Sequence, residues 1–454
     1  MGRVGRRRFW STLPYSLVLL GLVVIVLASL SLSLQMGQAD RTPADAPPRA
    51  WNATDRLIER LEKKQEVRQL DQYAYVELGG AYLQKARETG DPSYYNRSED
   101  ALLRALELEP RSASAMSLLG AVALGRHQFQ EALEWAERSL EIDASHANTY
   151  GVRGDAQIEL GKYPDGIESF QTMVDLKPNM DSYARVSYAR ELIGDMDGAI
   201  EAMQMAVAAG PPGTEPTAWA RVHLGNLYFN SGRIDQAAEL YQDALRDFDG
   251  YFLALAALGR AAAAQGRYNE AIDLYERSVA VIPQPATLSA LGDLYAKTGD
   301  MARAESQYDT VEFIAQLAAI NQVVYNRELV LFYADHHRNL DQALELATRE
   351  LAVRQDIYAY DALAWALYQK DRLDEAAEFI KEAMKLGTQD PNLYYHAGMI
   401  HYRLGDREVA RRYLEHALDL NPHFSVLYED HARKALAELQ GRAVSPDGLG
   451  GAPS

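Results

Sequence analysis

The sequence contains no cysteine among its 454 residues. This absence excludes disulfide bonds, thiolate metal sites, thiol nucleophiles and a lipid-modified N-terminal cysteine. Phosphate-binding loops, Gly-x-Gly-x-x-Gly, His-Glu-x-x-His and Gly-x-Ser-x-Gly are missing as well. No repeated unit carries a paired acid and nucleophile. We therefore expect a protein that is not an enzyme and that holds neither a cofactor nor a metal ion.

Basic residues are scarce, since 46 Lys and Arg face 64 Asp and Glu. Four arginines and no acids lie in residues 1–39, so the rest of the chain has 42 basic against 64 acidic residues, a formal charge of −22. A surface with this balance repels nucleic acid and anionic lipid. It favours basic protein or peptide partners, whose association would weaken as salt rises.

A period of 33 or 34 residues is the main positive feature of the chain. Small residues recur at this spacing between residues 113 and 424, and each is followed twelve residues later by a second one. The first set is Gly120, Gly154, Gly225, Gly259, Gly292 and Gly398, and the second is Ala132, Gly166, Ala237, Ala271, Ala304 and Ala410. Prolines close four units: Pro178, Pro211, Pro283 and Pro422. Such a period predicts a stack of helix pairs.

One unit, residues 252–281, illustrates the pattern. Apolar residues fall at helical spacing on both sides of Gly266-Arg267, which predicts two helices joined by a turn. Neither helix can bury its whole apolar face alone. Stability must come from contacts between neighbouring units.

The repeated residues resemble the tetratricopeptide repeat. The pattern of Leu-Gly, Tyr, Ala, aromatic and Ala is present as Leu224-Gly225, Tyr228, Ala237, Tyr241 and Ala244, and the later unit has Ala397-Gly398, His401, Ala410, Tyr413-Leu414, Ala417 and Pro422. The resemblance covers about residues 74–424. It implies an all-α solenoid of about ten helix-turn-helix repeats in a right-handed superhelix. It also implies a concave groove that binds peptides or proteins.

Some units depart from the family pattern. Ser187, Leu331 and Ala364 stand where glycine is usual, and the turn of the first unit, residues 87–97, looks enlarged. His336, His337, His396 and His401 cluster late in the chain, but His396 and His401 are five residues apart, whereas a metal pair on one helix face needs four.

The N-terminal residues predict a membrane-targeting segment. Four arginines between residues 3 and 8 precede an uncharged run, and Leu17 to Leu34 would span about 27 Å as a helix. We expect an uncleaved signal anchor in a bacterial-type plasma membrane, with the repeats on the outer side. A cleaved signal peptide that releases a periplasmic or secreted protein is the alternative, since Gly37-Gln38-Ala39 is an acceptable cleavage site.

Composition divides the chain into six segments. They are a signal anchor (1–36), a Pro/Ala-rich linker (37–53), an N-terminal capping helix (54–72), the repeat solenoid (73–424), a C-terminal capping helix (425–441) and a disordered tail (442–454).

By register, the inner helices of the last units place aromatic and acidic side chains in the groove, where earlier units have small residues such as Ala256 and Ala263. Large amphipathic side chains of this kind often anchor interfaces. The candidate partner-binding residues are Tyr325, Phe332, Tyr358, Asp361, Trp365, Tyr368, Tyr395 and Tyr402. The alternative is that they only pack between repeats.

These observations favour a protein–protein interaction scaffold of the cell envelope. Two other functions stay open at this point. One is an accessory of an envelope transport system that handles a small molecule or a metal. The other is a structural subunit of an envelope assembly.

Overall fold

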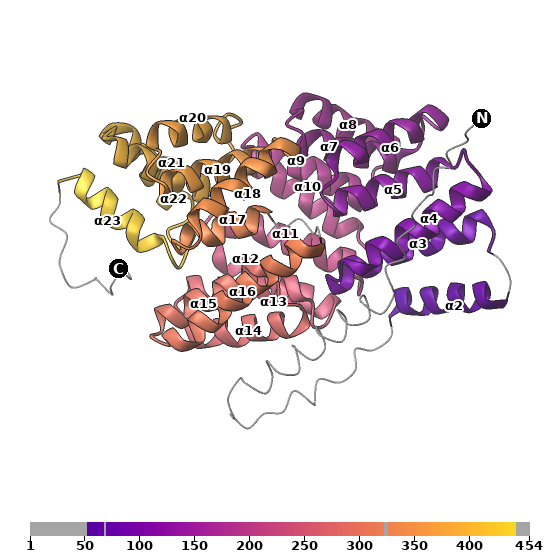
Figure 1. The fold of residues 1–454 in the computed structure, drawn as a ribbon, viewed down its shortest axis with the longest axis horizontal. Coiled ribbons are helices and arrows are strands. Elements are labelled where there is room, and N and C mark those ends of the chain that lie inside the picture. Colours follow the sequence, from indigo (N-terminus) through magenta and orange to yellow (C-terminus); the bar gives the residue numbers. More distant parts are fainter. Residues whose placement is uncertain (1–51, 68–69, 322–325, 442–454) are drawn as a thin grey trace, which may run out of the picture. The chain divides into compact units, whose positions relative to one another are not determined.

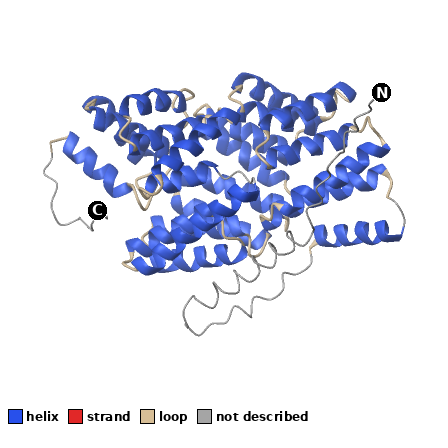
Figure 2. Ribbon diagram, viewed as in Figure 1, coloured by secondary structure: helices blue, strands red, loops and turns tan. Residues whose placement is uncertain are grey.

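The computed structural model describes residues 52–67, 70–321 and 326–441, without the side chains of 318–326. From Ala53 onward the described residues belong to one compact unit, residues 53–454. Figure 2 shows helices joined by turns, with no strand in this part of the chain. The expected all-α fold is confirmed. The candidate anchor, the residue 37–51 part of the linker and the tail lie outside the described residues.

In the part of the chain that the structure describes, twenty-two helices follow one another, labelled as in Figure 1. Their bounds are α2 Ala53–Val67, α3 Gln72–Thr89, α4 Ser93–Leu108, α5 Ala113–Gly125, α6 Phe129–Ile142, α7 Ala147–Glu159, α8 Tyr163–Leu176, α9 Met180–Leu192, α10 Met196–Ala209, α11 Glu215–Asn230, α12 Ile234–Asp247, α13 Phe252–Ala264, α14 Tyr268–Val281, α15 Pro285–Lys297, α16 Met301–Asn321, α17 Asn326–Asp335, α18 Leu340–Val353, α19 Ile357–Gln369, α20 Leu373–Ala383, α21 Pro391–Leu404, α22 Arg407–Leu420 and α23 Glu429–Leu439.

Pairing α3 with α4, and so on to α21 with α22, gives ten hairpins, which confirms the expected number of repeats. The odd-numbered helix of each pair is called the inner helix below. No helix among the described residues combines the length and apolar character needed to cross a bilayer.

The repeated small residues lie where the two helices of a hairpin cross. A Cβ atom added to Gly225 would lie 2.4 Å from the ring of Tyr241, and one on Gly292 would lie 2.4 Å from the ring of Tyr308. In the unit that has Ser187 in place of glycine, the Ser187 hydroxyl donates to the carbonyl oxygen of Ala199 on the partner helix, at 2.7 Å. The two helices of a hairpin thus meet closely either at a glycine or at a serine that donates a hydrogen bond to the partner helix.

The first turn is shorter than the sequence suggests. Helix α3 continues to Thr89 and α4 begins at Ser93. Gly90 adopts φ +70° and its N–H donates to Ala86, which ends α3 in the way typical of a glycine after a helix. The expectation of an enlarged turn at residues 87–97 was wrong because residues 87–89 still belong to α3 and residues 93–97 already belong to α4.

The solenoid winds back onto itself. Three turns within hairpins contact three turns between hairpins that lie 192 to 196 residues later. In each, a donor of the later turn meets a main-chain oxygen of the earlier one: Gln355 N–H to Glu159 O (2.8 Å), Thr388 Oγ1 to Leu192 O, and Asn421 Nδ2 to Phe229 O (2.8 Å). We call residues 159–161, 192–194 and 229–232, together with 354–356, 387–388 and 420–421, the inter-turn interface.

Glycines make this approach possible. Gly161, Gly194 and Gly232 have φ of +72°, +79° and +71°. A Cβ atom on them would lie 2.7, 2.5 and 2.9 Å from the carbonyl oxygens of Gln355, Gly387 and Leu420, respectively. At these three glycines the two turns therefore meet backbone against backbone, with no room for a side chain on the glycine.

Candidate functional site

Most of the candidate groove residues are buried. Phe332, Asp361, Trp365, Tyr368 and Tyr395 are each at most 8% exposed. Tyr358 and Tyr402 are half-buried, and Tyr325 lies outside the described residues. The structure thus differs from the expectation that these side chains line an open groove. Other residues of the same chain cover five of them.

Four of the buried residues form one cluster on the inner helices, whereas Phe332 packs against Tyr308 and His336. The Trp365 ring stacks on Tyr368 (centroids 4.6 Å apart) and on His396 (4.1 Å), and it lies 5.8 Å from the ring of Tyr395. His396 Nδ1 lies 2.8 Å from a carboxylate oxygen of Asp361. The sequence prediction therefore identified residues that do come together.

Besides His396, two further residues that the groove prediction missed belong to the cluster. Asp335 Oδ1 accepts hydrogen bonds from Trp365 Nε1 and from the Tyr428 hydroxyl, both at 2.7 Å. Burial raises the pKa of Asp335. Tyr428 comes from the C-terminal segment, 93 residues later. No local pattern in the sequence connects these two positions.

Both buried histidines of this region are paired with aspartates. Burial acts to lower the pKa of His396, but the Asp361 carboxylate and more distant acids outweigh it and hold this pKa above its usual value. His336 Nε2 lies 2.7 Å from Asp293 Oδ1. Burial acts to lower the pKa of His336, but the hydrogen bond to Asp293 and the charge of its carboxylate raise it above the usual value. The described residues contain no group of three or more His, Asp or Glu placed to hold a metal ion.

The inter-turn interface contains a buried charge cluster. The Arg354 guanidinium lies 2.5 Å from Glu159, 3.1 Å from Asp356 and 3.6 Å from Glu350. All four side chains are at most 17% exposed. Burial raises the pKa of Glu159 to about 7, although Arg354 opposes the shift. One cation thus pairs with three carboxylates between two turns of the solenoid.

A further acid, Glu191, lies beside the second contact of this interface. It precedes Leu192, whose carbonyl accepts from Thr388, so the turn brings it near Asp390. Burial, with a smaller contribution from the charge of Asp390, raises the pKa of Glu191 to about 7. Glu191, Asp390 and Tyr188 all act electrostatically on the hydroxyl of Tyr358, one of the candidate residues.

Glu191 should make stability depend on pH. Its pKa in the folded chain exceeds its usual value of 4.5, so its favourable contribution is complete below about pH 4.5 and is lost as pH rises through 7. We expect Glu191→Gln to raise the free energy of unfolding at pH 8 by about 1–3 kcal/mol and to change little at pH 5. Urea unfolding at both pH values measures this. The exposed Glu378→Gln serves as control, and equal pH profiles for the two variants would contradict the assignment.

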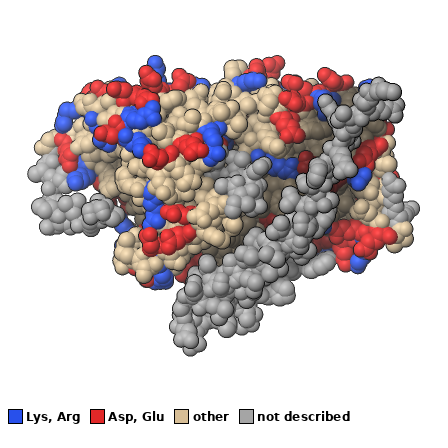
Figure 3. Space-filling model, viewed as in Figure 1, with Lys and Arg blue, Asp and Glu red and all other residues tan. Residues whose placement is uncertain are grey.

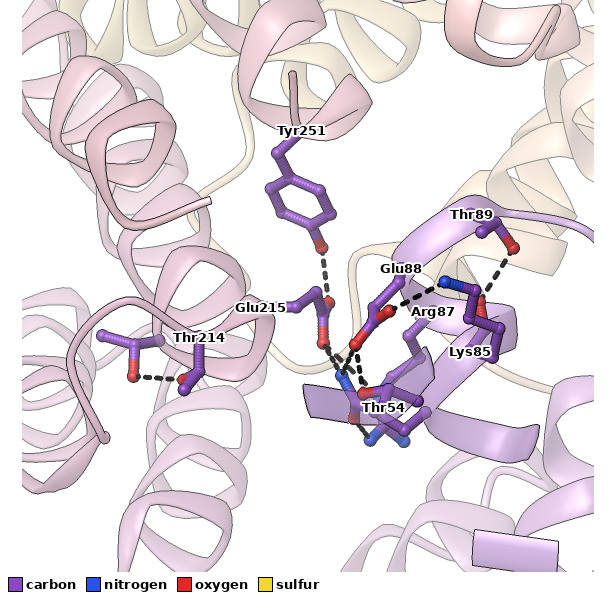
Figure 4. Close-up of polar contacts among 10 residues, drawn as sticks. Thr54, Lys85, Arg87, Glu88, Thr89, Thr214, Glu215 and Tyr251 are labelled. Carbon is purple, nitrogen blue, oxygen red and sulfur yellow. Dashed lines mark hydrogen bonds and ion pairs between the residues drawn. The ribbon is translucent and has the colours of Figure 1, made fainter. Parts of the chain in front are cut away.

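A second set of long-range polar contacts joins the first repeats to the middle of the chain (Figure 4). The buried Glu215 carboxylate, at the start of α11, accepts from the Tyr251 hydroxyl (2.8 Å) and from Gln84 Nε2 of α3 (2.9 Å). Glu88, also on α3, accepts from Thr54 of α2 at 2.6 Å. These contacts connect α2, α3, α11 and the turn before α13.

The surface carries both signs of charge. On the face seen in Figure 3, Asp and Glu side chains alternate with Lys and Arg rather than forming one large patch. A cavity of about 570 Å³ lies between the ends of α11 to α14 and the segment before α23. Asp235, Tyr268, His423 and Glu429 are among its lining residues, and no Lys or Arg is.

Consecutive helix hairpins that cross at small residues define a helical-repeat solenoid. Models of the tetratricopeptide repeat match residues 93–147, 152–214 and 223–286, and a second model of the same repeat matches residues 391–424. The chain is thus a tetratricopeptide repeat protein. Scaffolds of this family typically take part in protein–protein interaction.

The chain is similar to several larger proteins over part of their length. It is 28% identical over 223 residues to the human protein O-mannosyl-transferase TMTC1, covering 47% of this chain and 24% of that one. It is 24% identical over 245 residues to anaphase-promoting complex subunit 7 of Arabidopsis thaliana, covering 54% and 42%. The chain therefore spans less than half the length of either protein. Among solved structures, yeast Tom70 matches with a TM-score of 0.38 and 14% identity, covering 86% of this chain and 92% of that one.

Proposed function

We propose that the protein is a non-enzymatic scaffold that gathers protein partners at the outer face of a bacterial-type plasma membrane, through the inner faces of its hairpins. The observation that carries the proposal is the run of ten consecutive hairpins with aromatic side chains concentrated on the last inner helices. The acidic balance of the chain favours basic partner segments and a salt-sensitive association.

The half-buried Tyr358 is the residue with which to test partner binding. It belongs to the predicted set, and Glu191 and Asp390 lie close enough to act on its hydroxyl. The Arg327 guanidinium lies 5.5 Å from the centre of the Tyr358 ring, so a basic partner side chain would have to take its place at the ring and the two carboxylates. We expect Tyr358→Ala to abolish crosslinking to partner proteins in intact cells, whereas Glu378→Gln should leave it unchanged. Mass spectrometry identifies the crosslinked partners. Partners that crosslink equally to both variants would contradict a site at Tyr358.

The placement beyond a membrane rests on the arginines and the apolar run of residues 1–36. Because the chain has no cysteine, a single Glu378→Cys substitution gives one labelling site on an exposed position of the solenoid. A membrane-impermeant maleimide should label this variant once the outer envelope is permeabilised and the plasma membrane is left intact. Labelling only after the plasma membrane is lysed would overturn this part of the proposal and leave the scaffold itself standing.

A further inference from the structure

Residues 421–430 leave the regular repeat pattern. The sequence predicts a capping helix from residue 425, but α23 begins only at Glu429. The preceding residues instead pass along the ends of earlier inner helices, and the yellow loop before α23 lies beside α17 in Figure 1. We call residues 421–430 the crossing segment.

The crossing segment contacts inner helices far back in the chain. Asn421 donates to the carbonyl of Phe229 on α11, and Asp430 pairs with Lys297 at the end of α15, at 2.8 Å. The Tyr428 hydroxyl donates to Asp335, the last residue of α17. A helix that merely capped the last repeat would contact α21 and α22 alone. This segment reaches three further inner helices.

Its two aromatic side chains cover two of the candidate groove residues, Trp365 and Tyr395. The ring of Tyr428 stacks on Tyr395 (4.7 Å) and meets Trp365 edge-on (5.7 Å, 85°). Phe424 lies 5.5 Å from the ring of Tyr395. Both are at most 9% exposed. Trp365 and Tyr395 are therefore buried under an aromatic segment of the same chain.

The segment is not packed tightly on every side. The cavity of about 570 Å³ lies directly beneath it, and His423 and Glu429 contribute to the cavity wall. This cavity opens to solvent, so part of the segment lies beside open space rather than against packed protein. The segment is thus held by a few side-chain contacts at its two aromatic residues and its ends, which allows another segment with the same groups to replace it.

We propose that the crossing segment is an internal ligand of the inner-helix surface, and that the external partner is a protein segment offering the same groups. These are two aromatic side chains four residues apart, the second of which donates a hydroxyl to Asp335, followed by an acid that pairs with Lys297. The proposal rests on the proposed scaffold function and specifies one surface of it. Binding of a partner there displaces residues 421–430.

A labelled synthetic peptide of residues 419–441 tests this without any cellular partner. In the wild-type chain the tethered segment competes at a high effective concentration, so the free peptide should bind weakly. In the full-length Phe424→Ala/Tyr428→Ala variant we expect it to bind at least about tenfold more tightly, because the tethered competitor is weakened. A peptide carrying the same two alanines should not bind this variant.

A gentler variant covers the case in which the double substitution unfolds the last repeat. Tyr428→Phe removes only the hydroxyl that donates to Asp335, and it should tighten peptide binding about fivefold. Tyr73→Ala, at a 77% exposed position, should leave binding at the wild-type level. Equal peptide affinity for wild type and Tyr428→Phe, or equal binding of the alanine peptide, would overturn the proposal. That result would not affect a scaffold that binds elsewhere, which the Tyr358 experiment tests separately.

Discussion

Replacing Arg354 by methionine should destabilise the protein by about 3–5 kcal/mol, since removal of one partner leaves buried charges uncompensated. The guanidinium is the cation that Glu159, Glu350 and Asp356 share in the inter-turn interface. Methionine retains the length and apolar character of the arginine stem. The expected loss therefore comes from electrostatics rather than from a cavity.

A matched control lies five residues earlier in the chain. Arg349 belongs to α18, the helix that ends just before Arg354, and pairs with Glu345 at 3.8 Å, but its side chain is 63% exposed. Exposed pairs of this kind contribute about 0–1 kcal/mol, so Arg349→Met should be nearly neutral. Urea unfolding compares the two variants. If they lose the same stability, the Arg354 cluster does not hold the turns together.

The Arg354→Met loss should be smaller at low pH. The pKa of Glu159 is already raised to about 7 by burial, and of the groups that oppose this shift Arg354 has the largest effect. Without Arg354 the glutamate takes up a proton more readily, and a protonated carboxyl needs no cation. The variant should thus be closer to wild type at pH 5 than at pH 8. Adding Glu159→Gln to the variant should restore part of the stability at pH 8.

A local measurement separates loss of the interface from general instability. The Gln355 N–H donates to the carbonyl of Glu159 across the interface. Its hydrogen exchange should accelerate strongly in Arg354→Met, whereas amides within α13 and α14 should change less, because neighbouring repeats support each other. Uniform acceleration across all helices would show that the cluster stabilises the whole solenoid rather than this contact.

The repeats themselves could be predicted from the sequence because they depend on contacts between residues that are close in the sequence. Gly225 and Ala237 signal a helix crossing within one hairpin, and Pro283 marks the end of another, so both signals lie within about 34 residues. The aromatic cluster could be predicted in part for the same reason. Trp365 and Tyr395 lie on the inner helices of adjacent units and do contact each other.

The contacts between distant turns could not be predicted in this way. Gly194 and Gly266 have the same place in the repeat, since each follows an inner helix. Both adopt the left-handed conformation. Only the winding of the solenoid decides that one of them faces Gly387 and the other faces open space. The position of Tyr428 depends on the same winding, because its acceptor, Asp335, is 93 residues away.

This difference between the two glycines gives the second large effect. An added methyl group at Gly194 would lie 2.5 Å from the carbonyl oxygen of Gly387, whereas at Gly266 nothing lies within 4 Å. Both residues have similar φ, +79° and +73°. Alanine therefore suffers the same cost of about 1–2 kcal/mol for the left-handed conformation at either site. It also restricts the unfolded chain equally, so that contribution cancels in the comparison.

We therefore expect Gly266→Ala to cost about 1–2 kcal/mol and Gly194→Ala roughly 1–3 kcal/mol more, the usual range for overpacking a tight contact. Backbone lies on both sides of the contact, so relief requires the two turns to separate. Separation would break the Thr388 hydrogen bond to Leu192 and release the α20–α21 turn. Parallel thermal unfolding and hydrogen exchange of residues 385–390 measure both effects. Equal losses for the two variants, with no change in exchange at that turn, would mean that these turns do not touch in solution.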